Sequence, residues 1–417
     1  LDLDAPVQQV LPWFRTADRS ASAQITVRDL LHQTSGFTNY TGNDFSDDTS
    51  QAAVENAVRR LSEVELSGDE TFEYSNTNYD ILGLLVEAVS GESYADYLQT
   101  YIFDPLDMQH SYTTDRLPDA QADGLTTGYG SFFGAPVARE IIYPNAHLGS
   151  VGVISTAEDL SHYMLAQLNG GVYGDNRVLS EAGMAALQEP GVEAGDFLSY
   201  AMGWFRNGLW RAGTPAGDTV NVPLSLEHNG VWLGFSTNMI MLPSENLGVV
   251  TLLNHDDFTR QSAFNHAAYG ATLLMAGVEP PEMEVFEDSI TQNALLIYLV
   301  VIGLLLLRLV SAALSLRQWR RHPGARPAHP LGIAVKILLP LAVDVLAAYL
   351  ILVVIPDEYN SPFLETLRFN PDLGGLMILS LILMLGWGAV RTVLFARVLL
   401  RRPTEVVAAR AYAPASS

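Results

Sequence analysis

The sequence predicts an α+β domain followed by an all-α transmembrane module. Three observations lead to this prediction. The first part mixes helix-like and strand-like segments, long apolar segments dominate the second, and the net charge changes sign between them. We therefore expect a first domain at 1–282, a linker at 283–293 and a membrane domain at 294–417.

The first part mixes helices with strands. Apolar residues at helical spacing predict helices at 25–33, 50–64, 78–90, 94–106, 156–169 and 180–188. Strand-like runs occupy 198–205, 235–243 and 247–254, and a Ser-Glu-Asn turn between the last two predicts a hairpin. Thr156 and Asp159 have the spacing of a capping box, which marks the start of a helix.

Charge is distributed unevenly along the chain. Residues 1–290 hold 11 Arg, no Lys and 40 acidic residues, whereas residues 291–417 hold 12 basic and 6 acidic residues. Nucleic acid or an anionic membrane surface would repel so acidic a first part, so we expect no nucleic-acid partner. The chain has no Cys, which excludes disulfides, thiolate nucleophiles and Cys-ligated metals.

Three segments are long and apolar enough to span a membrane, since a hydrocarbon core about 30 Å thick takes roughly 20 helical residues. We expect the spans at 294–316, 331–355 and 375–400, with the lipid bilayer as a partner. Arginines concentrate in the loop after the first span, and acidic residues in the loop after the second. The positive-inside rule then predicts an extracytoplasmic first domain and a cytoplasmic C-terminus at the cell membrane.

Three charged residues lie inside the expected spans: Arg308, Asp344 and Arg391. An interhelical ion pair among them would reduce the cost of burying the carboxylate. A path for protons or substrate is the alternative role. Helix pairing is the simpler interpretation, because spans with so few polar residues are typical of an anchor.

Tyr74, Ser75 and Asn76 stand directly before a strongly apolar helical segment that Gly91 ends. Ser and Asn side chains at a helix start accept hydrogen bonds from its free N–H groups. Taken alone, this stretch therefore favours helix capping over catalysis.

Several common catalytic and cofactor motifs are absent from the sequence. It contains no H-E-x-x-H, no Gly-rich phosphate loop and no G-x-S-x-G elbow. His147, His162, His255 and His266 lack metal-ligand spacing and are expected to be surface or core residues. We predict no metal ion, nucleotide or other cofactor.

Five phrases follow one another through residues 1–280: ITVRDLLHQTSGF from Ile25, FEYSNTNYDILGLLVEAVSG from Phe72, HLGSVGVISTAEDLSHYMLAQLNGG from His147, YAMGWF from Tyr200 and LEHNGVWLGFSTNMIMLP from Leu226. In sequence and order they resemble the serine β-lactamase and penicillin-binding-protein superfamily, in the branch near class C β-lactamases, D-aminopeptidases and esterases. The resemblance implies a β-lactamase-like fold, with an antiparallel sheet flanked by helices, a helical subdomain, and an active site between them.

The resemblance assigns catalytic roles to the Tyr-x-Asn element. It implies that the Tyr74 hydroxyl takes part in proton transfer at a nucleophilic Ser and that Asn76 binds the substrate amide. Helix capping would then fall to Thr77 and Asn78.

A second family element is a strand bearing Lys-Thr-Gly or His-x-Gly, which here reads His228, Asn229, Gly230. The resemblance implies that His228 orients the substrate, that substrate lies against Gly230, and that the backbone N–H of Val231 supplies half of the oxyanion hole. Because the fixed cation of Lys-Thr-Gly is missing, esterase or D-amino-acid peptidase activity is favoured over β-lactamase activity.

The family's nucleophile element, Ser-x-x-Lys, does not occur in this chain, whose single Lys is Lys336. A Ser hydroxyl needs a nearby base, such as a desolvated Lys, to attack at neutral pH. The chain also has no initial Met and no signal peptide, so we expect an N-terminally truncated, inactive fragment of a membrane-anchored serine hydrolase for small-molecule or peptide substrates. The alternative is a non-catalytic sensor or binding module for cell-wall fragments.

Overall fold

The computed structural model describes most of the chain up to residue 400. The residues outside the description are 44, 47, 69–70, 141–142, 144, 196–197, 207–222, 258–259, 281–292, 328, 359–361 and 401–417. The predicted linker at 283–293 therefore lies outside the described residues, apart from Asn293. The chain forms two compact units: the first comprises Leu1–Gln292 and Asn360–Asn370, and the second Asn293–Tyr359 and Pro371–Ser417.

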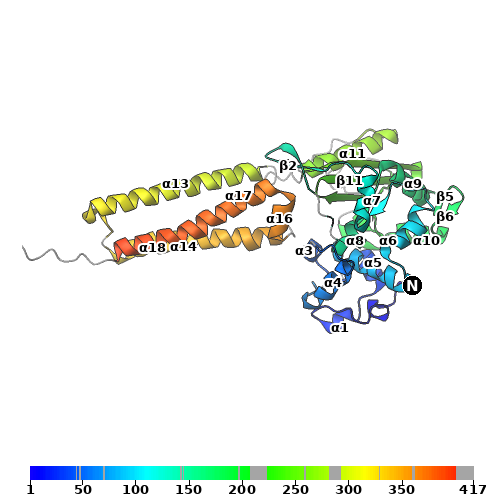
Figure 1. The fold of residues 1–417 in the computed structure, drawn as a ribbon, viewed down its shortest axis with the longest axis horizontal. Helices are drawn as coiled ribbons and strands as arrows, with labels where there is room; N and C mark the ends of the chain where they lie inside the picture. Colours follow the sequence, from blue (N-terminus) through cyan, green and yellow to red (C-terminus); the bar gives the residue numbers. More distant parts are fainter. Residues whose placement is uncertain are drawn as a thin grey trace, which may run out of the picture. The chain divides into compact units, whose positions relative to one another are not determined.

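An antiparallel six-stranded sheet lies at the centre of the first unit (Figure 1), with the strand order β12-β11-β10-β9-β8-β7. The strands are β7 Val192–Gly195, β8 Leu198–Tyr200, β9 Phe205–Arg206, β10 Leu226–Trp232, β11 Phe235–Leu242 and β12 Leu247–Leu253.

Helices cover both faces of this sheet. Ile240 of β11 packs against α11 (Gln261–Met275), whereas its neighbour Met241 packs in a core with Met164 of α9 (Ala157–Leu168). Because consecutive strand residues point to opposite faces, α11 and α9 lie on opposite sides of the sheet. The predicted α+β fold class is confirmed.

Three small sheets complete the strands of the described part of the first unit. They are β1 (Tyr112–Thr113) with β4 (Val153–Ile154), β13 (His255–Asp256) with β2 (Tyr129–Phe132) and β3 (Ala135–Ala138), and β5 (Val172–Tyr173) with β6 (Asn176–Arg177).

The remaining helices of the first unit lie mainly in its N-terminal half. They are α1 Arg19–Ser22, α2 Val27–His32, α3 Asn39–Gly42, α4 Ala53–Arg60, α5 Asn76–Ser90, α6 Tyr94–Leu98, α7 Leu117–Ala122, α8 Leu148–Val151, α10 Glu181–Gln188 and α16 Phe363–Phe369. Fully buried Phe14, Leu30, Phe37 and Ile81 form one core that joins the N-terminal segment to α2 and α5.

Most of the predicted elements of the first unit are confirmed, with one wrong strand. Residues 198–205 form two strands rather than one: β8 and β9 pair as a hairpin, in which Tyr200 lies opposite Phe205. Gly203 in the connecting turn has φ +90°, a left-handed conformation that favours glycine. The alternation of apolar residues continues through the turn, which is why periodicity alone missed it. The hairpin of β11 and β12 is confirmed.

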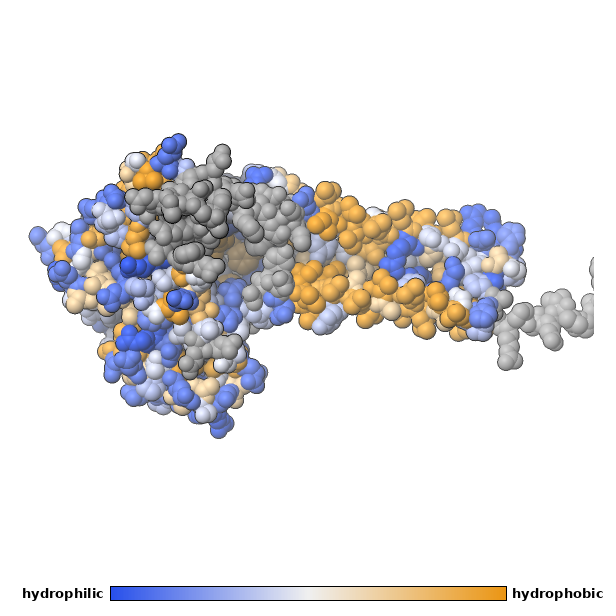
Figure 2. All heavy atoms as spheres, turned by 180° about the vertical axis from the view of Figure 1, so that it is seen from behind, coloured by the Kyte–Doolittle hydropathy of each residue, from blue (hydrophilic) through white to orange (hydrophobic). Residues whose placement is uncertain are grey.

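The second unit holds three helices of spanning length, over Leu295–Arg321, Pro330–Asp357 and Pro371–Leu399. The first is α13 (Ala294–Arg321); the second joins α14 (Pro330–Tyr349) to α15 (Ile355–Glu358), and the third joins α17 (Pro371–Leu381) to α18 (Trp387–Leu399). Apolar residues cover much of the face of this unit seen in Figure 2. The length and apolar surface of these helices support association of this unit with a membrane.

The three charged residues of the spans meet inside the second unit. Arg308 Nη1 lies 2.8 Å from Asp344 Oδ1, and Arg391 Nη2 lies 3.4 Å from Asp344 Oδ2. Asp344 and Arg391 are buried. One carboxylate from the second span thus joins an arginine from each of the other two.

Candidate active site

Tyr74 lies just before α5, in a group of aromatic rings that belong to residues of β8, β9 and β10. Its ring centroid is 6.3 Å from that of Tyr200, 6.2 Å from that of Phe205 and 5.9 Å from that of His228. Tertiary folding therefore brings the two elements that carry Tyr74 and His228 side by side, although they are far apart in the sequence.

The pKa of the Tyr74 hydroxyl lies above its ordinary value, mainly because the side chain is buried; neighbouring Tyr200 raises this pKa further. The hydroxyl therefore keeps its proton at neutral pH. A nearby cation would lower this pKa by stabilising the phenolate. Residues 1–290 contain no Lys, so a lysine that activates Tyr74 has to come from outside this part of the chain.

His228 is in the middle of β10. Its Nδ1 donates a hydrogen bond to the carbonyl oxygen of Asn229 at 2.8 Å, because a carbonyl can only accept. Burial lowers the pKa of the imidazole. At neutral pH, His228 is thus uncharged, with its proton on Nδ1 and an acceptor at Nε2.

Asn76 is the first residue of α5, and the structure ties it to α3. Its Nδ2 donates to the carbonyl oxygen of Gly42 at 3.4 Å. A Cβ atom at Gly42 would lie 2.5 Å from the backbone nitrogen of Asn76, so only glycine permits this close approach. Asn76 therefore borders the α3 side of the candidate site.

The predicted capping of α5 by Thr77 and Asn78 is wrong. The helix begins at Asn76, which places both residues inside its first turn, and the N-cap Ser75 makes no side-chain capping bond. The Asn78 side chain instead accepts from Ser35 Oγ at 2.5 Å and donates to Gln33 Oε1. A tertiary partner has taken the place of the local cap. Gly91 ends the helix as predicted, with φ +75°.

Gln33 holds the segment that carries Tyr74, a role that the sequence did not reveal. Its backbone oxygen accepts from Glu73 N at 2.9 Å, and its Oε1 accepts from Ser75 N at 3.0 Å. Asn39 Nδ2 donates to the Tyr74 carbonyl oxygen at 3.0 Å. Gln33 lies within the phrase ITVRDLLHQTSGF, and Asn39 follows it closely. This phrase was the only sequence signal that pointed to them.

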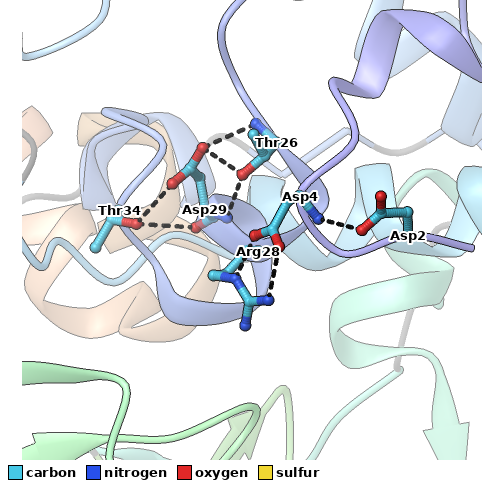
Figure 3. A network of polar contacts seen from close by, with 6 residues as sticks. All are labelled: Asp2, Asp4, Thr26, Arg28, Asp29 and Thr34. Carbon is cyan, nitrogen blue, oxygen red and sulfur yellow. Dashed lines mark hydrogen bonds and ion pairs between the residues drawn. The ribbon is translucent and has the colours of Figure 1, made fainter.

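The position of Gln33 depends on α2, whose start is fixed by a full capping box (Figure 3). Thr26 Oγ1 accepts from Asp29 N at 3.1 Å, and Asp29 Oδ2 accepts from Thr26 N at 2.8 Å. Arg28 Nε pairs with Asp4 at 2.6 Å and joins the N-terminal segment to this helix. The capping box predicted at Thr156 and Asp159 forms only in part. Thr156 Oγ1 accepts from Asp159 N, but the Asp159 side chain accepts from His110 N and from Ser111 Oγ instead.

Gly230 and Val231 continue β10 beyond His228. Gly230 lies opposite Thr237, and a Cβ atom there would lie 2.7 Å from Thr237 Oγ1, so a larger residue would force the Thr237 side chain to move. Val231 is 38% exposed. Over the part of the chain that is described, β9 pairs with β10 only at Leu226 and Glu227. The edge of β10 from His228 onward is therefore not covered by a described strand.

Two of the other histidines, His147 and His162, have structural partners. His147 is buried; its Nδ1 lies 2.8 Å from Asp80 Oδ2 and its Nε2 accepts from Ser46 N at 3.2 Å. His162 Nδ1 lies 3.0 Å from the Leu106 carbonyl oxygen. Among the described residues, no cluster of three His, Asp or Glu side chains is arranged to hold a metal ion.

Comparisons with known proteins agree with this geometry. The family model described as beta-lactamase matches residues 1–273. Protein flp of Staphylococcus aureus (strain MW2) is 30% identical over 269 residues, which cover 61% of this chain and 48% of that protein. Penicillin-binding protein 4* of Bacillus subtilis (strain 168) is 28% identical over 251 residues, which cover 56% of this chain and 52% of that protein. The chain spans about half the length of the curated relatives it matches.

Solved structures share the fold. The octameric penicillin-binding protein homologue from Pyrococcus abyssi superposes with a TM-score of 0.51 and 22% identity, over 69% of this chain and 63% of that one. A class C beta-lactamase from Rhodobacter sphaeroides gives a TM-score of 0.50 and 22% identity, over 66% of this chain and 79% of that one.

Proposed function

Because this chain belongs to the beta-lactamase family, a superfamily of serine hydrolases, we propose that its first unit is part of the catalytic domain of a membrane-anchored serine hydrolase that forms an acyl-enzyme on an amide or ester. The observation that carries the proposal is the approach of Tyr74 to His228, with 5.9 Å between ring centroids. These two residues belong to two separate family elements, and they meet at an edge of β10 that no described strand covers.

The proposed chemistry requires a Ser-Lys pair from a polypeptide segment outside these 417 residues, because they contain no Ser-x-x-Lys. In support, the Ser75 hydroxyl is buried beside the site and has no hydrogen-bond partner among the described residues. A buried polar group of this kind usually has a partner, and the added segment could provide one. Without that segment, we expect the chain to be inactive.

In the proposed reaction, the Lys lowers the pKa of Tyr74, and the Ser hydroxyl attacks the substrate carbonyl as its proton passes to the Lys–Tyr74 pair. The N–H of Val231 stabilises the oxyanion, and the leaving group departs with a proton returned through Tyr74. Water then hydrolyses the acyl-enzyme. Asn76 and His228 orient the substrate.

The charge state of His228 bears on the substrate. A neutral imidazole offers an acceptor at Nε2 and no fixed positive charge for a substrate carboxylate. This supports ester or D-amino-acid peptide hydrolysis over β-lactam hydrolysis. Lack of Lys in residues 1–290 favours a second candidate, a non-catalytic module that binds cell-wall fragments.

We place the catalytic domain at about 1–282 on the extracytoplasmic side, with a linker at 283–293 and the membrane domain at 294–417. The arginines in the last turn of α13 support a cytoplasmic position for that end of the helix. The group of Arg308, Asp344 and Arg391 would then hold the three spans together.

The first test is covalent labelling of the full-length protein in membranes with a fluorophosphonate and with a fluorescent penicillin. A Ser nucleophile predicts labelling, and Tyr74→Phe should slow it about a hundredfold or more, as expected for loss of a proton-transfer group. Tyr101→Phe is the matched control, because Tyr101 is exposed and lies outside the site. Folded protein that reacts with neither probe would favour the binding module.

A further inference from the structure

Three aromatic rings form a cluster at one end of the candidate site. The ring centroids of Phe45 and Trp232 are 4.9 Å apart, and that of Phe369 lies 6.2 Å from Phe45 and 5.8 Å from Trp232. All three side chains are half-buried, so each keeps part of its ring surface accessible. We call Phe45, Trp232 and Phe369 the aromatic wall.

The wall adjoins both sides of the candidate site. Trp232 stands on the same strand as His228 and, since strand residues two apart share a face, on the same face. Phe45 follows α3 closely in the chain, and Gly42 at the end of α3 contacts Asn76. The third member, Phe369, ends α16, which lies between the second and third spans in the sequence but belongs to the first unit.

A half-buried arginine holds α16 in this position. Arg139 Nη1 donates to the carbonyl oxygen of Arg368 at 2.9 Å, and Nη2 donates to that of Phe369. These carbonyls at the helix end have no partner within α16 itself. Arg139 is paired in turn with Asp256, with 3.6 Å between Nε and Oδ1.

A second arginine joins α16 to the Phe45 segment. Arg368 Nη1 donates to the Phe45 carbonyl oxygen at 3.1 Å and lies 3.2 Å from Glu365 Oε2. Both arginines near the wall are therefore engaged by protein oxygens. The surface that the wall offers is apolar, and an apolar substrate group matches it.

We propose that the aromatic wall binds an apolar acyl group of the substrate and that α16 positions it. The inference rests on the proposed hydrolase function and adds a substrate class to it: esters or amides whose acyl part is an alkyl or aryl chain. Phe369 contacts that chain, whereas Arg139 and Arg368 are positioning residues.

Labelling rates of the full-length protein with ethyl and octyl fluorophosphonates test this proposal. The octyl probe should react faster, and Phe369→Ala should lower the octyl-to-ethyl rate ratio about tenfold, the effect of losing one aromatic contact of about 1.4 kcal/mol. Arg139→Gln should lower the same ratio, because α16 loses its anchor. Leu364→Ala is the matched control, since Leu364 lies on α16 and is 70% exposed, and it should leave the ratio unchanged.

The outcomes separate this proposal from the function on which it rests. If both probes label the wild type and Phe369→Ala keeps the wild-type ratio, the wall does not bind the acyl group, while the hydrolase function stands. If neither probe labels folded wild type, the hydrolase function fails and the wall proposal fails with it. Phe369→Leu retains an apolar side chain and should give a smaller decrease, which keeps the test decisive if the alanine variant unfolds.

Discussion

Two groups of ionisable residues, one in each unit, are placed in different surroundings: Asp344 with its arginines, and Tyr74 with His228. In the second unit, Asp344 is met by Arg308 and Arg391, so the buried charge is balanced by opposite charges. In the first unit, Tyr74 and His228 lie together, no ion pair joins either of them to another described residue, and burial shifts the pKa of each toward its neutral form.

This difference distinguishes buried groups that stabilise the fold from buried groups that can take part in a reaction. A charge that is balanced on both sides holds helices together and does not change state easily. The pKa of a neutral titratable group moves when a charge is placed beside it, and a cation beside a tyrosine favours the reactive phenolate. The contrast predicts that mutations in the second unit act on stability, whereas mutations in the first unit act on reactivity as well.

The largest expected effect comes from removing the shared carboxylate. Asp344→Ala leaves two arginines without a counter-charge inside the membrane helices, and breaking a buried ion pair costs about 3–5 kcal/mol. We expect a loss of that size in the free energy of unfolding of the full chain in detergent micelles.

A matched variant sharpens the same test. In Asp344→Leu combined with Arg391→Leu, the buried carboxylate and its buried partner are both replaced, so much of the lost stability should return. If Asp344→Ala unfolds no more easily than wild type, the three charges are not what holds the helices together.

An intermediate effect is expected at Gln33, which positions the Tyr74 segment. Gln33→Ala removes the acceptor of Ser75 N and Asn78 Nδ2 and leaves both donors buried, which costs about 1–3 kcal/mol. The fluorophosphonate labelling rate of the full-length protein should fall as well, because Tyr74 loses its support. The control is Gln24→Ala, where an exposed side chain donates to the Ser20 carbonyl oxygen nearby in the chain. If Gln24→Ala also slows labelling, the effect of Gln33→Ala is not specific to the Tyr74 segment.

The smallest effect is a pH dependence at His228. Because burial lowers its pKa in the folded state, the unfolded chain binds the proton more readily. Stability from this residue is fully present above the unfolded pKa of about 6.5 and decreases as pH falls toward the folded pKa. Urea titrations between pH 8 and pH 5 should show this loss in wild type and a shallower pH dependence in His228→Gln. Equal slopes would mean that His228 is not buried as a neutral group.

Local patterns identified many elements because their causes are local. Apolar periodicity located α5, and Gly91 marked its end, since a left-handed residue suits glycine. Length and hydropathy located the three spans, because a bilayer imposes both. The turn at Gly203 was missed, because the apolar alternation runs through it unchanged.

The sequence by itself determined the two-part organisation, the fold class and the family, through hydropathy, periodicity and five ordered phrases. Only the tertiary structure decided which distant groups meet: Gln33 with Ser75, Tyr74 with His228, and Phe369 with Trp232. The physical reason is that a hydrogen bond, a ring contact or a shifted pKa depends on neighbours in space, which the order of residues along the chain does not specify.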